Sequence, residues 1–127
     1  MSISVLIVDD SSTIRKIISR CLQAELGISE VWEAGDGQEA LDLLAKRTVS
    51  VVLSDINMPR MDGLQLLAAI KQKEAWNSMP VLMITTEGGA ETVVDAVKKG
   101  AAGYIKKPFT AMEIRDQLAP VIKAVGS

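Results

Sequence analysis

The sequence predicts an α/β fold in which a parallel sheet of five strands is covered by helices on both faces. Five short runs of branched apolar residues alternate with five stretches of helical spacing. Such alternation favours right-handed crossovers and a parallel sheet. The chain has 127 residues and no linker, low-complexity tract or repeat, so we expect it to form one domain over residues 1–127.

The predicted strands are short and rich in β-branched residues. They are Ile3–Val8, Glu30–Ala34, Val49–Leu53, Pro80–Thr85 and Gly103–Ile105. The first, third and fourth runs are almost continuously hydrophobic, which is typical of strands that are buried on both faces. Helices on both sides of the sheet are therefore expected.

The predicted helices carry apolar residues at spacings of three and four. On the first helix one face holds Ile14, Ile17, Ile18, Cys21 and Leu22, and on the last it holds Ile114, Leu118, Val121, Ile122 and Val125. A fourth helix over about residues 91–99 has a weaker start signal, after Gly88 and Gly89. Pro120 lacks a backbone N–H and should kink or interrupt the last helix.

Helix start signals support these boundaries. The side chains that can accept hydrogen bonds from the first helical turns are Ser11 or Ser12, Asp36, Asp62, and Thr110 with Glu113 three residues later. Each stands directly before an apolar helical pattern, so the helices are expected to begin there.

Composition limits the possible functions. Hydrophobic residues make up 48% of the chain, which argues against disorder, and the net charge of −2 argues against nucleic-acid binding. There is no histidine and only one cysteine, so His-based catalysis, His-ligated metals and an internal disulfide are excluded. No apolar run approaches the roughly 20 residues of a membrane span, and the N-terminus lacks the basic start of a signal peptide. We expect a cytoplasmic protein.

Polar residues stand where the predicted strands end. Asp9 and Asp10 follow the first strand, and Asp55 ends the third. Thr85 and Thr86 end the fourth, and Lys106 and Lys107 end the fifth. Because the carboxyl ends of parallel strands share one edge of the sheet, these side chains should converge on one site. Taken singly, each is as well explained by a turn, a helix cap or a strand end, and only their joint placement indicates a site.

The chemistry of this group suits phosphoryl transfer. Three carboxylates in one cleft repel one another, and a hard divalent cation such as Mg²⁺ relieves the repulsion. A metal beside a lysine and a hydroxyl stabilises phosphoryl oxygens, and a carboxylate can attack phosphorus to form an acyl phosphate.

The sequence also resembles a known family. The segments "VLIVDDSSTIRKII", "DINMPRMDGLQLL", "VLMITTE" and "GAAGYIKKPFT", in this order, are similar to the receiver domain of two-component response regulators. The resemblance spans almost the whole chain and is strongest to stand-alone, chemotaxis-type (CheY-like) regulators. It implies a flavodoxin-like sheet with strand order 2-1-3-4-5 and a single receiver domain over residues 1–127.

The resemblance also implies roles for individual residues. Asp55 would accept the phosphoryl group from a histidine kinase. Mg²⁺ would bind Asp10, Asp55 and the backbone carbonyl of Asn57, with Asp9 acting through water. Lys107 would contact the phosphoryl group and Asp9 or Asp55, and its peptide bond to Pro108 is usually cis in the family.

The same resemblance implies a conformational switch. Thr85 would hydrogen-bond a phosphoryl oxygen, and Tyr104 would change rotamer as Thr85 moves. Asn57 and Glu87 occupy positions that tune hydrolysis of the phosphate. The switched surface would be the fourth helix, fifth strand and fifth helix of a monomer, where a protein partner binds.

Some positions depart from the best-studied chemotaxis regulators. Ile56 replaces a Trp, Lys106 an aliphatic residue, and Gln117 and Pro120 replace lysines. The core chemistry is unaffected by these changes, but they bear on the identity of the partner.

Three other functions remain open at this stage. The protein could be a phosphate carrier or sink in a phosphorelay. It could be an aspartyl-phosphate phosphotransferase or hydrolase, although those enzymes carry Asp-x-Asp after their first strand. It could also be a mononucleotide-binding or scaffolding domain, which would not need all the polar positions. We expect a phosphoacceptor that assists its own phosphorylation and dephosphorylation rather than an enzyme.

Overall fold

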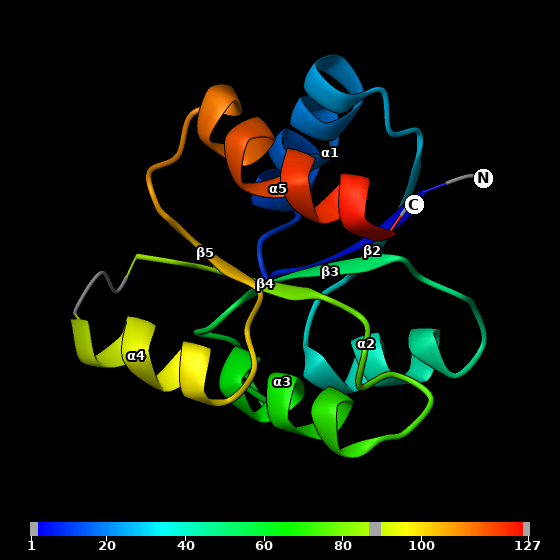
Figure 1. Ribbon diagram of the computed structural model, residues 1–127, viewed down its shortest axis with the longest axis vertical. Helices are drawn as coiled ribbons and strands as arrows, with labels where there is room; N and C mark the ends of the chain where they lie inside the picture. The colour runs from blue at the N-terminus through cyan, green and yellow to red at the C-terminus, as the bar shows by residue number, and fades with distance from the viewer. Residues whose placement is uncertain (1–2, 87–89, 126–127) are drawn as a thin grey trace.

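The computed structural model describes residues 3–86 and 90–125, over which five strands alternate with five helices (Figure 1). The elements are β1 (Ser4–Val8), α1 (Ser12–Leu26), β2 (Glu30–Ala34), α2 (Gly37–Leu44), β3 (Val51–Asp55), α3 (Gly63–Gln72), β4 (Val81–Thr85), α4 (Ala90–Lys98), β5 (Gly103–Lys106) and α5 (Ala111–Val125). No helix in these two ranges is both long and apolar enough to cross a membrane.

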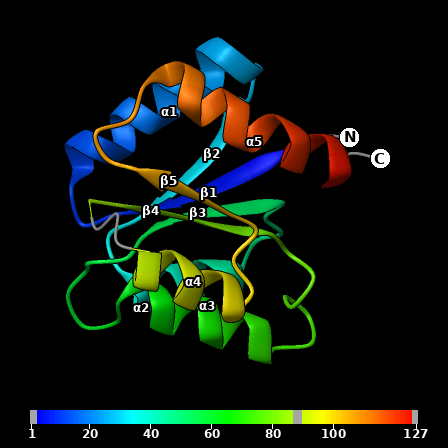
Figure 2. The ribbon, with the colours of Figure 1, turned by 60° about the vertical axis from the view of Figure 1, so that its left-hand side comes forward.

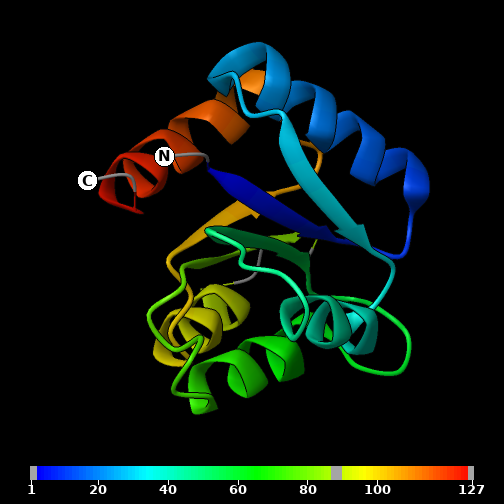
Figure 3. The same ribbon diagram turned by 90° about the vertical axis from the view of Figure 1, so that its right-hand side faces the viewer.

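The strands form one parallel sheet in the order β2-β1-β3-β4-β5. Helices α1 and α5 cover one face, and α2, α3 and α4 cover the other (Figure 1; Figure 3 shows the sheet from the side). The predicted α/β class, the helices on both faces and the strand order 2-1-3-4-5 are confirmed.

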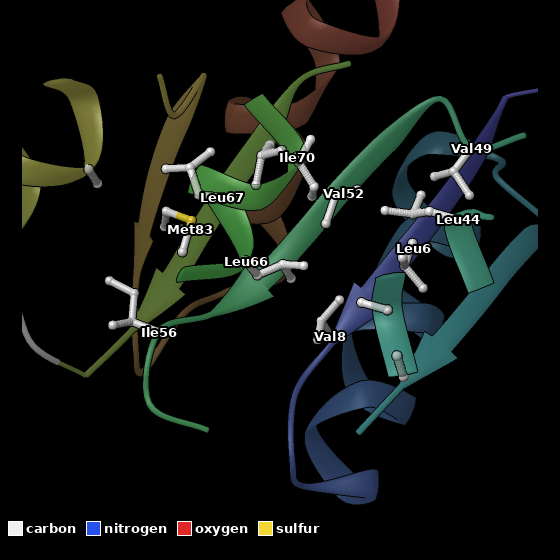
Figure 4. Close-up of a cluster of buried hydrophobic side chains, with 14 residues drawn as sticks. Leu6, Val8, Leu44, Val49, Val52, Ile56, Leu66, Leu67, Ile70 and Met83 are labelled. Atoms are coloured by element: carbon white, nitrogen blue, oxygen red, sulfur yellow. The ribbon is translucent and has the colours of Figure 1, made fainter. Parts of the chain in front are cut away.

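The two faces of the sheet explain the continuous hydrophobicity of the central strands. Successive side chains of a strand point to opposite faces. In β1, Leu6 and Val8 belong to the core beneath α2, α3 and α4 (Figure 4), whereas Val5 and Ile7 belong to the core beneath α1 and α5. Both kinds of position are buried and apolar, so the alternation of polar and apolar residues expected of a half-exposed strand disappears.

The helix caps form as their sequences predict. Ser11 accepts a hydrogen bond from the Ile14 N–H and is the cap of α1, which settles the choice between Ser11 and Ser12. Asp36 caps α2, and Asp62 forms a capping box with Gln65 at the start of α3. The Thr110 hydroxyl accepts the Glu113 N–H at 3.1 Å before α5.

The boundary predicted for the third strand is wrong by two residues. The predicted run was Val49–Leu53, but β3 is Val51–Asp55. Pairing with β1 begins at Val51, and pairing with β4 continues to Asp55, which lies opposite Ile84. The backbone ladder determines where the strand ends, so it includes Asp55 despite the charge of this side chain.

Two predictions for the helices are also corrected. Ile17 was placed on the buried face of α1, but it is 40% exposed, whereas Ile18 is buried. Successive helical residues lie about 100° apart, so the apolar arc of α1 is wider than the arc that contacts the sheet. Pro120 does not interrupt α5, which runs through it and is held on the sheet by the buried Ile114 and Leu118.

The loop after β3 closes on itself at Gly63. The Gly63 N–H donates to the carbonyl of Ile56 at 2.8 Å. A Cβ atom at Gly63 would lie 2.1 Å from the carbonyl oxygen of Asp55. Only glycine therefore allows α3 to begin this close to the end of β3.

This contact predicts unequal costs for two glycine substitutions. Gly63→Ala should lower the free energy of unfolding by about 3 kcal/mol or more, because backbone atoms must move to admit the methyl group. Gly27→Ala should cost only about 1 kcal/mol, since Gly27 has a φ of 67° but open space around it. Urea denaturation of both variants measures the difference. An equal loss of unfolding free energy in the two variants would show that small backbone shifts are enough to admit a methyl group at Gly63.

Candidate functional site

The site lies at the carboxyl edge of the sheet, where the loops after β1, β3 and β5 leave on one side of the molecule (Figure 2). Asp9 and Asp10 follow β1, Asp55 is the last residue of β3, and Lys107 follows β5. One carboxylate oxygen from each of the three aspartates lies within 4.8 Å of the other two. The structure thus brings together residues that are up to 98 positions apart in sequence.

Asp9 is buried and held by several hydrogen bonds. Its side chain is 2% exposed. Its backbone N–H donates to the carbonyl of Ala34, and its Oδ1 accepts the N–H of Ser11 at 2.9 Å. The Arg15 guanidinium donates through Nη1 to the Asp9 carbonyl at 2.6 Å and through Nε to Glu33 at 2.9 Å. The loop that carries Asp9 is therefore tied to both α1 and β2.

Lys107 joins two of the carboxylates. Its Nζ donates to Asp9 Oδ2 at 3.0 Å and to Asp55 Oδ2 at 3.3 Å. The backbone N–H of Lys107 donates to the carbonyl of Thr85 at 2.8 Å, and the Lys107–Pro108 peptide bond is cis. The side chain is 15% exposed, so these are partly desolvated ion pairs.

Burial and charge shift the protonation of these groups. Burial raises the pKa of the Asp55 carboxyl above its usual value, and the charge of Asp9 adds to this effect, while Lys107 opposes it. Burial alone would lower the pKa of the Lys107 ammonium, but its hydrogen bonds and ion pairs with Asp9 and Asp55 raise it. The site therefore has an unfavourable excess of negative charge that one ammonium does not remove.

The oxygens present fit a hard divalent cation. Asp9 and Asp55 are buried, whereas Asp10 is exposed, so the cluster is open to solvent on one side. Asn57, whose backbone carbonyl is the further ligand implied by the resemblance, is also exposed and lies two residues after Asp55. Carboxylates, a carbonyl and water are the ligands that Mg²⁺ prefers. The cluster could hold such an ion.

The other predicted residues lie close to this edge. Thr85 is fully buried at the end of β4. Tyr104, in β5, is partly buried and packs against the core beneath α2, α3 and α4. Glu87, expected to tune hydrolysis, lies outside the described residues.

Sequence reasoning missed several supporting contacts. It did not predict the arginine that binds the Asp9 carbonyl, nor the ion pair between Arg60 and Asp36 beside the loop after β3. Asp36 was predicted only as a helix cap. The position of Arg15 in α1 does not indicate that it contacts Asp9 and Glu33, because long charged side chains on helices are usually solvated.

Comparison with known proteins identifies the family. Residues 5–119 match the model of the response regulator receiver domain. The chain belongs to this family. It is 44% identical over 119 residues to a chemotaxis protein CheY homolog of Campylobacter jejuni (strain 81-176), a match that covers 93% of this chain and 91% of that protein.

Solved structures give the same result. The receiver domain is similar to Vibrio cholerae chemotaxis protein CheY4 with a TM-score of 0.88 and 37% identity, covering 95% of this chain and 99% of that one. It is also similar to the signal receiver domain of a signal transduction histidine kinase from Syntrophus aciditrophicus, with a TM-score of 0.87, 27% identity, and coverage of 98% and 92%. The chain is a CheY-like response regulator receiver domain.

The electrostatics of the cluster predict a pH-dependent effect of Mg²⁺ on stability. The raised pKa of Asp55 means that the folded, metal-free protein binds a proton more tightly than the unfolded chain does. Its stability should therefore fall as pH rises from the ordinary aspartate range through that raised pKa. Mg²⁺ at ten times its dissociation constant should add about 1.4 kcal/mol to the free energy of unfolding at neutral pH.

This gain should shrink as pH is lowered through the raised pKa of Asp55, because metal binding requires the ionised carboxylate. Thermal denaturation with and without Mg²⁺, at several pH values, measures it. Asp10→Asn should remove most of the gain. If Mg²⁺ left the melting temperature unchanged at every pH, the conclusion that the acidic cluster suits this ion would be wrong.

Proposed function

We propose that this receiver domain is a phosphorylatable switch of a chemotaxis- or motility-type two-component system. It accepts a phosphoryl group from a histidine kinase on Asp55 with the help of Mg²⁺, and presents a changed surface to a protein partner. The observation that carries the proposal is the Lys107 ammonium bonded to both Asp9 and Asp55 beside an open acidic cluster. This arrangement combines a carboxylate nucleophile with cationic groups for phosphoryl oxygens.

The transfer step needs few groups. An Asp55 carboxylate oxygen attacks the phosphorus of the kinase phosphohistidine, a P–O bond forms, and the P–N bond breaks. The imidazole nitrogen leaves with the electron pair of that bond and takes a proton from solvent. Asp10, Asp55 and the Asn57 carbonyl would hold Mg²⁺, which would supply positive charge for the phosphoryl oxygens.

Lys107 and Asp9 act on the same step from the other side. The Lys107 ammonium neutralises charge on a phosphoryl oxygen, and its two ion pairs hold it at the site in advance. Asp9 orients that ammonium and would act on the metal through water. Because Asp55 ends a buried strand, its backbone is held in the sheet opposite Ile84.

The switch proposal is supported by apolar residues on the surface of α4 and α5. Val94 and Val97 on α4 are 50% and 59% exposed, and Met112 on α5 is 57% exposed. Tyr104 lies on β5, which follows α4 and precedes α5. A protein partner that covers this α4–β5–α5 surface would bury apolar area, and Thr85 and Tyr104 would couple the surface to Asp55.

The partner should differ from the flagellar-motor segment bound by well-studied chemotaxis regulators. Gln117 and Pro120 stand on α5 where those regulators present lysines, and both are exposed. Loss of two positive charges weakens binding to an acidic partner.

A phosphate carrier or sink in a phosphorelay is the second candidate. The similarity to a receiver domain from a histidine kinase of Syntrophus aciditrophicus favours it, since a receiver in that position suits relay chemistry. A carrier would need Asp55 and Lys107 but no coupled surface. An aspartyl-phosphate phosphotransferase enzyme would instead turn over phosphate esters.

Asp55→Asn should abolish phosphate uptake, because an amide does not attack phosphorus. Incubation with acetyl phosphate and Mg²⁺, followed by mass spectrometry, should show one added phosphate on the parent and none on the variant. Asp42→Asn, on the exposed side of α2, is the matched control and should take up phosphate as the parent does. Undiminished uptake by Asp55→Asn would end the assignment, and turnover of phosphate esters would favour the enzyme.

Phosphorylation should alter the α4–β5–α5 surface more than the opposite face. Hydrogen exchange with and without beryllofluoride, an acyl-phosphate mimic, should change protection in residues 86–117. The partner should prefer the phosphorylated form by about 1–3 kcal/mol, the usual range of such couplings. Tyr104→Ala should weaken this preference with nearly normal phosphate uptake, and Tyr104→Phe, which keeps the ring, should weaken it less. Protection that changes only near Asp55 would favour the carrier.

A further inference from the structure

The loop between β3 and α3 carries Asn57 and is closed at its base. The Gly63 N–H donates to the Ile56 carbonyl at 2.8 Å, and within the loop the Met61 N–H donates to the Pro59 carbonyl at 2.8 Å. These bonds fix the ends and the shape of the loop. They do not fix how its tip lies relative to the rest of the protein.

Arg60, at the tip of this loop, has an unusual backbone conformation. Its φ is 66°, in the left-handed region, and among the described residues it is the only one other than glycine with a positive φ. Glycine or asparagine adopts this conformation more readily than arginine does, so a turn alone gives no reason for arginine here. The side chain of Arg60 is the feature that requires explanation.

The Arg60 guanidinium forms an ion pair with Asp36, through Nη2 and Oδ2. The Asp36 side chain is only 6% exposed, although that of Arg60 is 67% exposed. The other oxygen of Asp36, Oδ1, accepts the Glu39 N–H at 2.9 Å and caps α2. The hydrogen bond from Arg60, with the backbone hydrogen bond of the cap, holds the pKa of Asp36 below its usual value.

A second contact lies beside this ion pair. A Cβ atom at Gly37, the first residue of α2, would lie 2.7–2.9 Å from side-chain atoms of Met61. Met61 therefore packs directly against the backbone of α2. Two contacts therefore hold the tip of the loop against the first turn of α2. One is the ion pair with the buried Asp36, and the other is the apolar contact of Met61.

We propose that Arg60, through its ion pair with Asp36, is a positioning residue that sets the Asn57 carbonyl for Mg²⁺ binding beside Asp55. The inference rests on the proposed function, because it assigns a role at that same metal site. Asn57 lies three residues before Arg60 and two after Asp55, in the segment between the end of β3 and the tip of the loop. With the end of β3 fixed in the sheet, the ion pair fixes the other end of this short segment.

The test compares Mg²⁺ affinity with metal-free stability. Arg60→Asn keeps a residue that tolerates the left-handed region and loses the ion pair. Asp36→Ser keeps a good cap for α2 but removes the oxygen that binds Arg60. Arg47→Asn, before the amino end of β3, is the control, since Arg47 is exposed and stacks 3.9 Å from the centre of the Trp32 ring, away from the loop.

Calorimetric titration with Mg²⁺ should show about tenfold weaker binding for Arg60→Asn and for Asp36→Ser, the lower end of the loss seen when groups that orient metal ligands are removed. The double variant should lose no more Mg²⁺ affinity than either single variant does. Arg47→Asn should bind Mg²⁺ as tightly as the parent. A purely structural role would lower the melting temperature in EDTA and leave the affinity of the folded protein unchanged.

Two results overturn the proposal while the parent binds Mg²⁺. One is an affinity of Arg60→Asn within twofold of the parent. The other is a double variant whose fold loss of Mg²⁺ affinity equals the product of the fold losses of the two single variants. The two residues would then act independently. A parent that binds no Mg²⁺ would instead defeat the metal site of the proposed function, and the inference with it.

Discussion

The Lys107 ammonium, bonded to two carboxylates that follow or end different strands, is the interaction on which the site depends. In the sheet, β4 lies between β5 and β3. Lys107 follows β5, yet it reaches Asp55 at the end of β3 and Asp9 after β1. Its side chain must therefore cross the end of β4, whose last residue is Thr85. The same contact that balances charge at the cluster joins the ends of three strands, β1, β3 and β5.

The position of this contact explains much of the surrounding architecture. Carboxylates approach closely only if their backbones are held against mutual repulsion. The ladder of parallel strands holds Asp55, and Arg15 with the Ser11 N–H holds Asp9. The tight start of α3 at Gly63 holds the loop that follows Asp55. A strand thus carries Asp55, and the loops that carry Asp9 and follow Asp55 are tied to neighbouring helices.

Most of the fold could be predicted because each strand and helix has a pattern that its environment requires. Val5 and Ile7 face one core and Leu6 and Val8 the other, so a continuous apolar run indicates a strand covered on both sides. The pattern failed where hydrophobicity and backbone pairing disagree. Asp55 is charged but still belongs to the ladder of β3. The meeting of three aspartates and a lysine could be predicted from their places at strand ends. The contact of Arg60 could not, because its sequence neighbours give no sign of a partner 24 positions away.

The charges of the cluster connect the proposed chemistry to the proposed switch. Three carboxylates and one ammonium leave two negative charges, which one divalent cation neutralises. An aspartyl phosphate carries more negative charge than the carboxylate it replaces, and adds acceptor oxygens. Lys107 already donates to two carboxylates and has one further N–H, so the other new oxygens need donors from elsewhere. Thr85 has a hydroxyl at the same edge but is fully buried. In the proposed switch, bringing that hydroxyl to the phosphoryl group would change packing next to α4 and β5. A local change of charge would in this way reach a surface built from those elements.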